Sequence, residues 1–199
     1  GSGYIPADPA WITAVRARCR EAGALMILDE IQTGMGRTGK WFSYQHSRIK
    51  PDIVTCAKGL GNGVPIGACL GNKKVSKLFT PGSHGSTFGG NPLGVSVAKT
   101  ALGVIREEKL TQNARYLGEL FRTAMQEYIK TSTIVSKVRG KGLLNAIVIN
   151  DIEASETAWN ICIKLKENGL LAKPTHGNII RFAPPLVISE DQLYECVEI

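Results

Sequence analysis

Two carboxylates and a glycine-rich loop follow a short apolar run in the sequence LMILDEIQTGMGRTGK, residues 25–40. Asp29 and Glu30 end the apolar run, and residues 34–40 match two nucleotide-binding patterns in form. The P-loop pattern G-x-x-x-x-G-K requires Ser or Thr next, to hold magnesium, but the next residue is Trp41. The dinucleotide pattern G-x-G-x-x-G must open a helix, and the residues after it carry no helical apolar stripe. We therefore predict that this loop holds neither a nucleotide nor a nicotinamide cofactor.

A lysine follows the next apolar segment along the chain. Residues 24–28 and 51–56 are short and apolar, as expected for neighbouring buried strands of a parallel sheet. Asp29 follows the first segment, and Lys58 lies just beyond the second. Because ligands gather at the carboxyl ends of parallel strands, we expect both side chains to face one crevice. The alternative is that they form a simple salt bridge. Glu30 would point to the opposite side of the strand.

Pyridoxal phosphate is a cofactor whose chemistry requires such a pair. A lysine holds it as a Schiff base, and a carboxylate keeps its ring nitrogen protonated, so that the ring can accept electrons. The lysine, once displaced by the substrate amine, can carry protons. The phosphate needs donors, and GSHGSTFGGNP supplies the hydroxyls of Ser86 and Thr87 before a helix expected to begin at Asn91. Asp29 and Lys58 are therefore the candidate catalytic residues.

Several stretches of the sequence resemble one enzyme family. LMILDEIQTGMGRTGKWFSYQH, PDIVTCAKGLGNGVPIGA and GSHGSTFGGNPLG together are similar to the class III aminotransferases, pyridoxal-phosphate enzymes that act on terminal amines. VRGKGLLNAIVI and NGLLAKPTHGNIIRFAPPLVI resemble the ornithine aminotransferase branch, whereas AKGLGNGVPIGA looks closer to the acetylornithine branch. The resemblance covers essentially the whole chain, which would correspond to the C-terminal half of a family member.

The resemblance implies roles for the matching residues around the cofactor. Asp29 would pair with the ring nitrogen of pyridoxal phosphate, Gln32 would hydrogen-bond the ring hydroxyl oxygen, and Lys58 would form the Schiff base. Thr87, with Ser86 beside it, would donate to the phosphate. In the family that contact reaches the partner subunit's cofactor, which implies a homodimer with a site shared across the interface.

The implied reaction transfers an amino group in two stages. The terminal (delta) amine of ornithine would pass to the cofactor, leaving glutamate semialdehyde, and 2-oxoglutarate would then collect it and leave as glutamate. Arg181 would bind a substrate carboxylate with its planar fork, although an arginine snorkelling from a strand is the structural alternative. The alternative functions are an acetylornithine or other omega-amino-acid aminotransferase, and a non-catalytic fragment that lacks the N-terminal half.

The elements that must position these residues indicate an α/β protein. Helices alternate with short apolar strands in the first part, which is typical of a mostly parallel sheet. The expected strands are 24–28, 51–56, 66–72, 142–149 and 178–186, and the expected helices are 8–23, 92–108, 155–169 and two that begin at Thr111 and Ser189. With the resemblance, this predicts a fold-type I pyridoxal-phosphate transferase. Residues 1–110 would be the C-terminal part of its large domain, and residues 111–199 its small C-terminal domain, truncated at the end.

Composition and charge argue against several other classes. The net charge of +7 is spread along the chain and the longest basic run is Lys73-Lys74, so we do not expect nucleic-acid binding. The five cysteines are dispersed, without CxxC or a metal-like pairing with histidine, which indicates a reducing compartment and no metal site. There is no signal-peptide pattern and no apolar run of membrane-spanning length. We expect an intracellular protein; the resemblance implies the mitochondrial matrix in a eukaryote or the cytoplasm in a bacterium.

Overall fold

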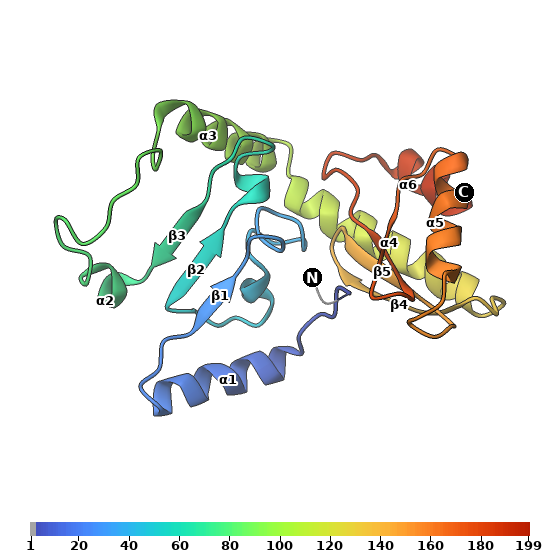
Figure 1. Ribbon diagram of the computed structural model, residues 1–199, viewed down its shortest axis with the longest axis horizontal. Coiled ribbons are helices and arrows are strands. Elements are labelled where there is room, and N and C mark those ends of the chain that lie inside the picture. Colours follow the sequence, from blue (N-terminus) through green and yellow to red (C-terminus); the bar gives the residue numbers. More distant parts are fainter. Residues whose placement is uncertain (1–2) are drawn as a thin grey trace. The chain divides into compact units, whose positions relative to one another are not determined.

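The computed structural model describes residues 3–199, which form two compact units (Figure 1). One unit comprises Ala7–Thr111, and the other comprises Gln112–Ile199 together with residues 3–6. Each unit contains one sheet and its own helices. This combination confirms the predicted α/β class.

A three-stranded sheet with the order β1-β2-β3 lies in the first unit. β1 (Ile27–Asp29) pairs in parallel with β2 (Ile53–Cys56), and the register places Asp29 opposite Thr55. β3 (Ala68–Gly71) is the third expected strand, but it runs antiparallel to β2. Residues 57–67, which connect β2 to β3, form no α-helix, whereas a parallel crossover usually runs through one.

The helices of the first unit begin where the sequence supplies caps. α1 (Pro9–Glu21) follows Asp8, whose Oδ1 accepts a hydrogen bond from the Ala10 N–H at 2.6 Å. α3 (Pro92–Glu107) follows Asn91, whose Oδ1 accepts from the Gly94 N–H at 2.8 Å. Both helices start with proline, which suits the first helical position. The remaining elements are the short helix α2 (Lys73–Ser76) and the 3-10 turns η1 (Ser43–His46) and η2 (Lys58–Leu60).

Asp52 connects three elements of the first unit. Its carboxylate forms a bidentate salt bridge with Arg16 of α1. It also accepts hydrogen bonds from the Met26 N–H ahead of β1 at 2.9 Å and from Asn72 Nδ2 ahead of α2 at 2.8 Å. These bonds, above all those from Arg16, lower the pKa of Asp52 from the ordinary 3.8 to about 2. The ends of β1 and β2 opposite to Asp29 are therefore fixed by a largely buried charge.

A four-stranded antiparallel sheet with the order β4-β5-β7-β6 lies in the second unit. β5 (Leu144–Ile149) and β7 (Ile179–Phe182) match two expected strands. β4 (Val135–Lys141) and β6 (Lys173–Thr175) were not expected, because lysine and arginine on these edge strands obscure the apolar pattern. The helices are α4 (Leu110–Ile129), α5 (Thr157–Glu167) and α6 (Glu190–Glu198).

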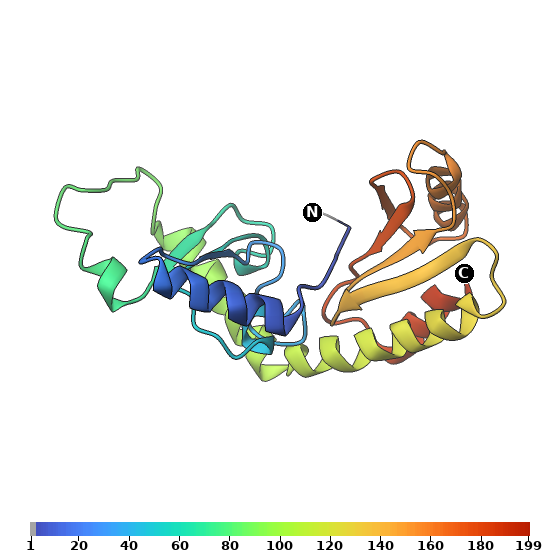
Figure 2. The same ribbon diagram turned by 90° about the horizontal axis from the view of Figure 1, so that it is seen from below.

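The core of the second unit lies between its helices and one face of the sheet. Ile180 of β7 packs with Cys162 of α5, and Leu117 and Phe121 of α4 pack with Leu193 of α6. Figure 2 shows α4 running along the sheet. Among residues 3–199, no helix combines the length and apolar character that a membrane crossing requires.

Candidate active site

Asp29 is exposed at the carboxyl end of β1, and one of its oxygens is held in place. Oδ1 accepts hydrogen bonds from the Ile31 N–H at 2.9 Å and from Thr55 Oγ1 at 3.3 Å. Oδ2 has no hydrogen-bond partner among the described residues. The carboxylate is therefore oriented and keeps one oxygen for a donor outside the chain. Thr55 was not among the predicted site residues, although its position opposite Asp29 in a parallel pair could have revealed it.

Glu30 has a structural role instead. Its carboxylate is buried and accepts hydrogen bonds from Thr33 Oγ1, from the Ser43 N–H at 3.0 Å and from the Tyr44 N–H at 2.9 Å. The glycine-rich loop wraps around this carboxylate. Gly34 permits the close approach, because a Cβ at this position would lie 2.8 Å from the Glu30 carbonyl oxygen. Residues 34–40 form turns and do not open a helix, so the loop lacks the context that a dinucleotide motif requires.

Lys58 is exposed and begins η2, with its backbone in the left-handed region at φ +46°. This conformation costs a residue with a side chain roughly 1–2 kcal/mol, so the surroundings must hold it. The Lys58 carbonyl accepts hydrogen bonds from the Gly61 and Asn62 N–H groups, each at 3.0 Å. Gly61 permits this turn, because a Cβ there would lie 2.2 Å from the Val64 carbonyl oxygen. Backbone strain of this kind is concentrated at functional sites.

The structure brings Asp29 and Lys58 to the same edge of the sheet. β1 and β2 are neighbouring parallel strands, so their carboxyl ends lie side by side. Within residues 3–199 no salt bridge joins the two side chains, so the simple ion pair weighed from the sequence is not found. Gln32 is half-buried in the turn that follows β1. Helix α3 packs against η2 and so supports the turn that carries Lys58.

Ser86 and Thr87 are exposed on the segment that joins α2 to α3. Ser86 Oγ accepts a hydrogen bond from the Gly89 N–H at 2.9 Å. In both ribbon views this segment extends outward beyond β3, on the side of the sheet away from β1 (Figures 1 and 2). The chain therefore does not fold these two hydroxyl groups onto its own Asp29 and Lys58.

Arg181 lies on β7, in the second unit, and is half-buried. Its guanidinium carbon lies 4.8 Å from the centroid of the Tyr4 ring. Its Nε is buried and has no acceptor among the described residues. The stack on Tyr4 was not anticipated from the sequence, which gave no reason to connect residues so far apart in the chain.

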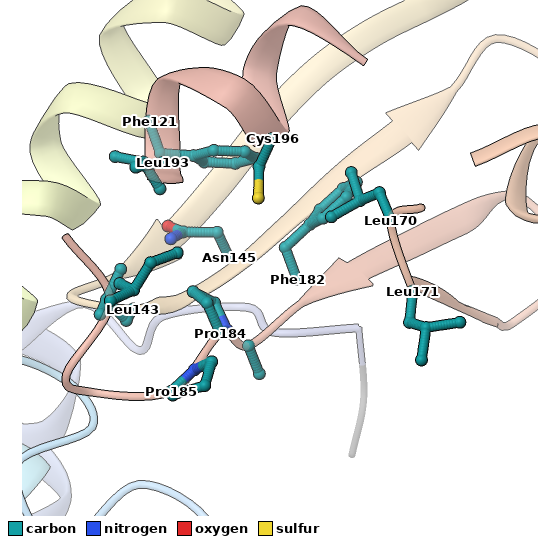
Figure 3. A pocket seen from close by; sticks show the side chains of 12 residues that line it. Phe121, Leu143, Asn145, Leu170, Leu171, Phe182, Pro184, Pro185, Leu193 and Cys196 are labelled. Carbon is teal, nitrogen blue, oxygen red and sulfur yellow. The ribbon is translucent and has the colours of Figure 1, made fainter. Parts of the chain in front are cut away.

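An apolar cavity of about 270 Å³ opens in the second unit, and none of the predicted site residues line it (Figure 3). Phe121, Leu143 and Phe182 line it, together with Cys196 of α6. Burial raises the pKa of the Cys196 thiol, so the thiol stays protonated. The side chain of Asn145 is already hydrogen-bonded within the unit. This cavity offers apolar volume without the groups that chemistry needs, so the candidate active site is the β1–β2 edge.

Comparison with known proteins decides the family. The family model for class-III aminotransferases matches residues 1–199. The chain belongs to this family. Ornithine aminotransferase of Saccharomyces cerevisiae is 52% identical over 198 residues, which cover 97% of this chain and 46% of that protein. Mitochondrial ornithine aminotransferase of Rattus norvegicus is 49% identical over 199 residues, which cover 100% of this chain and 45% of that protein.

A solved structure supports the same fold for this class-III aminotransferase chain. Acetylornithine aminotransferase from Elizabethkingia anophelis matches it with a TM-score of 0.92 and 51% identity, over 96% of this chain and 50% of that one. The predicted family and fold are thus confirmed. The chain spans about half the length of these relatives.

Proposed function

We propose that the protein containing this chain is a pyridoxal-phosphate-dependent aminotransferase that moves the terminal amino group of ornithine to 2-oxoglutarate. The products are glutamate semialdehyde and glutamate. The observation that carries the proposal is the placement of Asp29 and Lys58 on one sheet edge without a salt bridge between them. The yeast and rat relatives, both named ornithine aminotransferases, support the choice of substrate.

The residues at this edge fit pyridoxal phosphate. Asp29 Oδ2 is free to accept a hydrogen bond from a protonated ring nitrogen, while Thr55 and the Ile31 N–H hold Oδ1. Gln32, in the turn after β1, would hydrogen-bond the ring hydroxyl oxygen. When bound, the cofactor supplies an electron sink that makes the hydrogen on the amine-bearing carbon of the substrate acidic.

Lys58 would hold the cofactor covalently and then move the proton. Its Nζ is exposed and has no carboxylate partner among the described residues, so it can act as a nucleophile and as a base. Two backbone hydrogen bonds hold the Lys58 carbonyl, so the strained turn fixes the Cα from which the Lys58 side chain extends. The Asp29 carboxylate would stabilise the positive charge on the ring nitrogen.

The functional protein would be a homodimer in which Thr87 and Ser86 bind the phosphate of the partner subunit's cofactor. The outward course of the segment that carries them supports this assignment. Apolar side chains on and beside the same segment are strongly exposed, namely Phe79 at 62%, Phe88 at 81% and Leu93 at 72%. A surface of this kind is typical of a protein interface.

Arg181 would bind a substrate carboxylate. Its planar guanidinium matches a carboxylate through two parallel hydrogen bonds, and no carboxylate of the described residues neutralises it.

The rat relative is named mitochondrial, and we infer the mitochondrial matrix for this protein if its source is a eukaryote and the cytoplasm if it is a bacterium.

Acetylornithine is the second candidate amino donor. The specific support for it is the acetylornithine aminotransferase structure, which is 51% identical to this chain. Ornithine presents a free alpha-amino group where acetylornithine presents a neutral amide. Parallel assays with the two donors, at equal concentrations and with 2-oxoglutarate as acceptor, distinguish them. If acetylornithine is turned over faster than ornithine, acetylornithine becomes the proposed substrate.

The deciding experiment traps the cofactor on the protein. The purified protein is incubated with pyridoxal phosphate and reduced with borohydride, and the modified lysine is mapped by mass spectrometry. Selective labelling of Lys58, lost in Lys58→Ala and kept in Lys99→Ala on the exposed surface of α3, is expected. Lys58→Ala should also abolish turnover. Scattered labelling without turnover would favour a non-catalytic fragment instead.

A further inference from the structure

Three cations share one cross-strand row of the second sheet. Arg139 of β4 lies opposite Ala146 of β5, and Ala146 lies opposite Arg181 of β7. Lys173 of β6 lies opposite Arg181 on its other side. Directly opposite residues of antiparallel strands point to the same face, so these positive charges repel one another across the small Ala146 side chain. Among the described residues, none of the three forms a salt bridge.

In this row the Tyr4 ring contacts Arg181, where a salt bridge would use a carboxylate. The Arg181 guanidinium carbon is 4.8 Å from the ring centroid, within the range of a cation–π contact. Tyr4 is 8% exposed and packs in a cluster with Leu144, Ala146 and Ile179. The ring therefore stabilises and orients the guanidinium without cancelling its charge. A carboxylate at this place would compete with any anionic ligand.

Tyr4 is held firmly enough to act as a support. Its backbone is in the left-handed region at φ +55°, which for a bulky residue persists only where neighbours enforce it. The preceding residue is fixed to the sheet, because Arg139 Nε donates a hydrogen bond to the Gly3 carbonyl at 2.7 Å. Arg139 thus anchors residue 3, and the ring of the next residue, Tyr4, orients Arg181.

The accessible part of Arg181 is restricted by the same packing. Its Nε is buried and has no acceptor among the described residues. An incoming carboxylate must then meet the two terminal nitrogens of the fork. We propose that Tyr4 is a positioning residue, which holds the Arg181 guanidinium by cation–π stacking so that its terminal nitrogens bind the substrate carboxylate end-on. This inference rests on the proposed role of Arg181 as the carboxylate ligand.

The test compares Tyr4→Leu, which removes the ring, with Tyr4→Phe, which keeps it, in the complete protein. The first measurement is glutarate binding by isothermal titration calorimetry, which requires no turnover. Tyr4→Leu should weaken binding about three- to thirtyfold, the range of one cation–π contact, and Tyr4→Phe should stay within about twofold. The second measurement is steady-state kinetics, in which Tyr4→Leu should raise the KM for 2-oxoglutarate by a similar factor and leave kcat within about twofold.

Two controls separate positioning from general damage. Tyr128→Leu removes an exposed tyrosine of the same unit and should change neither measurement. An aldehyde acceptor without a carboxylate should show the same kcat/KM in Tyr4→Leu and wild type, whereas a misfolded site would lose activity with both acceptors.

Each remaining outcome is decisive. Unchanged glutarate affinity in Tyr4→Leu, or an equal loss in Tyr4→Phe, would overturn the role of the ring. Absence of glutarate binding to the wild type would overturn the inference as well. If the protein lacks aminotransferase activity but glutarate affinity still depends on the Tyr4 ring, the proposed reaction fails and the Tyr4–Arg181 assignment stands.

Discussion

Thr55 donates a hydrogen bond from its Oγ1 to Asp29 Oδ1, at 3.3 Å, across the pairing of β1 with β2. The bond is side chain to side chain, so it orients the carboxylate and not merely the strand. Because Oδ2 has no partner among the described residues, the direction in which Asp29 presents its free oxygen depends on Thr55 and the Ile31 N–H.

Thr55→Val tests this relationship, because valine keeps the shape of threonine and removes the hydroxyl. The lost hydrogen bond is worth about 1 kcal/mol, so we expect roughly fivefold weaker binding of pyridoxal phosphate. Absorbance titration of the apoprotein measures the affinity. Thr100→Val, on the exposed surface of α3, is the matched control and should bind the cofactor like wild type. Equal affinity in Thr55→Val would show that Asp29 is oriented without it.

The adjacent carboxylates Asp29 and Glu30 should respond in opposite ways to loss of charge. Asp29→Asn removes an exposed charge that is proposed to face the cofactor, so turnover should fall about a hundredfold or more. Its free energy of unfolding should stay within about 0.5 kcal/mol of wild type, as for other surface changes. Urea denaturation and steady-state assays measure both quantities.

Glu30→Gln gives the reverse pattern. The buried Glu30 carboxylate accepts three hydrogen bonds from its own loop, so the amide should lower the free energy of unfolding by about 2–3 kcal/mol. The turnover of the protein that remains folded should change much less than in Asp29→Asn. A loss of turnover in Glu30→Gln without loss of stability would mean that Glu30, and not Asp29, is the catalytic carboxylate.

Much of the candidate site was predictable from the sequence because it depends on local rules. Asp8 and Asn91 cap helices as their types predict, and the apolar segments before Asp29 and Lys58 form parallel strands. These features require only knowledge of neighbours along the chain and of the handedness of the fold.

Other features could not be predicted because they depend on distant partners. β1 begins at Ile27 and not at residue 24, and it is an edge strand of the described sheet in which Ile27 is 59% exposed. An apolar run by itself does not reveal which side of a strand is covered. The Tyr4–Arg181 stack joins residues from opposite ends of the chain, and no sequence pattern encodes such a pair.

The exposed Phe88 next to Thr87 should contribute to the proposed homodimer. Phe88→Ser removes a ring that is 81% exposed, and an interface anchor of this type is worth about 2 kcal/mol or more. The dimer dissociation constant should therefore rise about thirtyfold, as measured by sedimentation equilibrium. Trp159→Ser, at a 57% exposed position on α5, should leave it unchanged. A monomeric wild type, or an unaffected Phe88→Ser dimer, would contradict the assignment of this surface.

Acid should weaken the first unit through Asp52. Its pKa is about 2 in the folded protein and 3.8 ordinarily, so the folded state favours the charged form. A group with a depressed pKa stabilises the fold above its ordinary pKa, and that stability is lost as the pH falls through the folded value. The contribution is about 2 kcal/mol, present above about pH 4 and lost toward about pH 2.

Asp52→Asn isolates this contribution from that of the other carboxylates. The amide cannot neutralise Arg16, whose side chain is 12% exposed, so the variant should be less stable than wild type near neutral pH. The difference between the two proteins should shrink between about pH 4 and pH 2, since wild-type Asp52 is then protonated. Urea denaturation across this range measures it. Glu21→Gln, which breaks the exposed salt bridge to Arg18, should show no such dependence. A constant difference between Asp52→Asn and wild type over the whole range would mean that hydrogen-bond geometry, and not charge, gives Asp52 its stabilising effect.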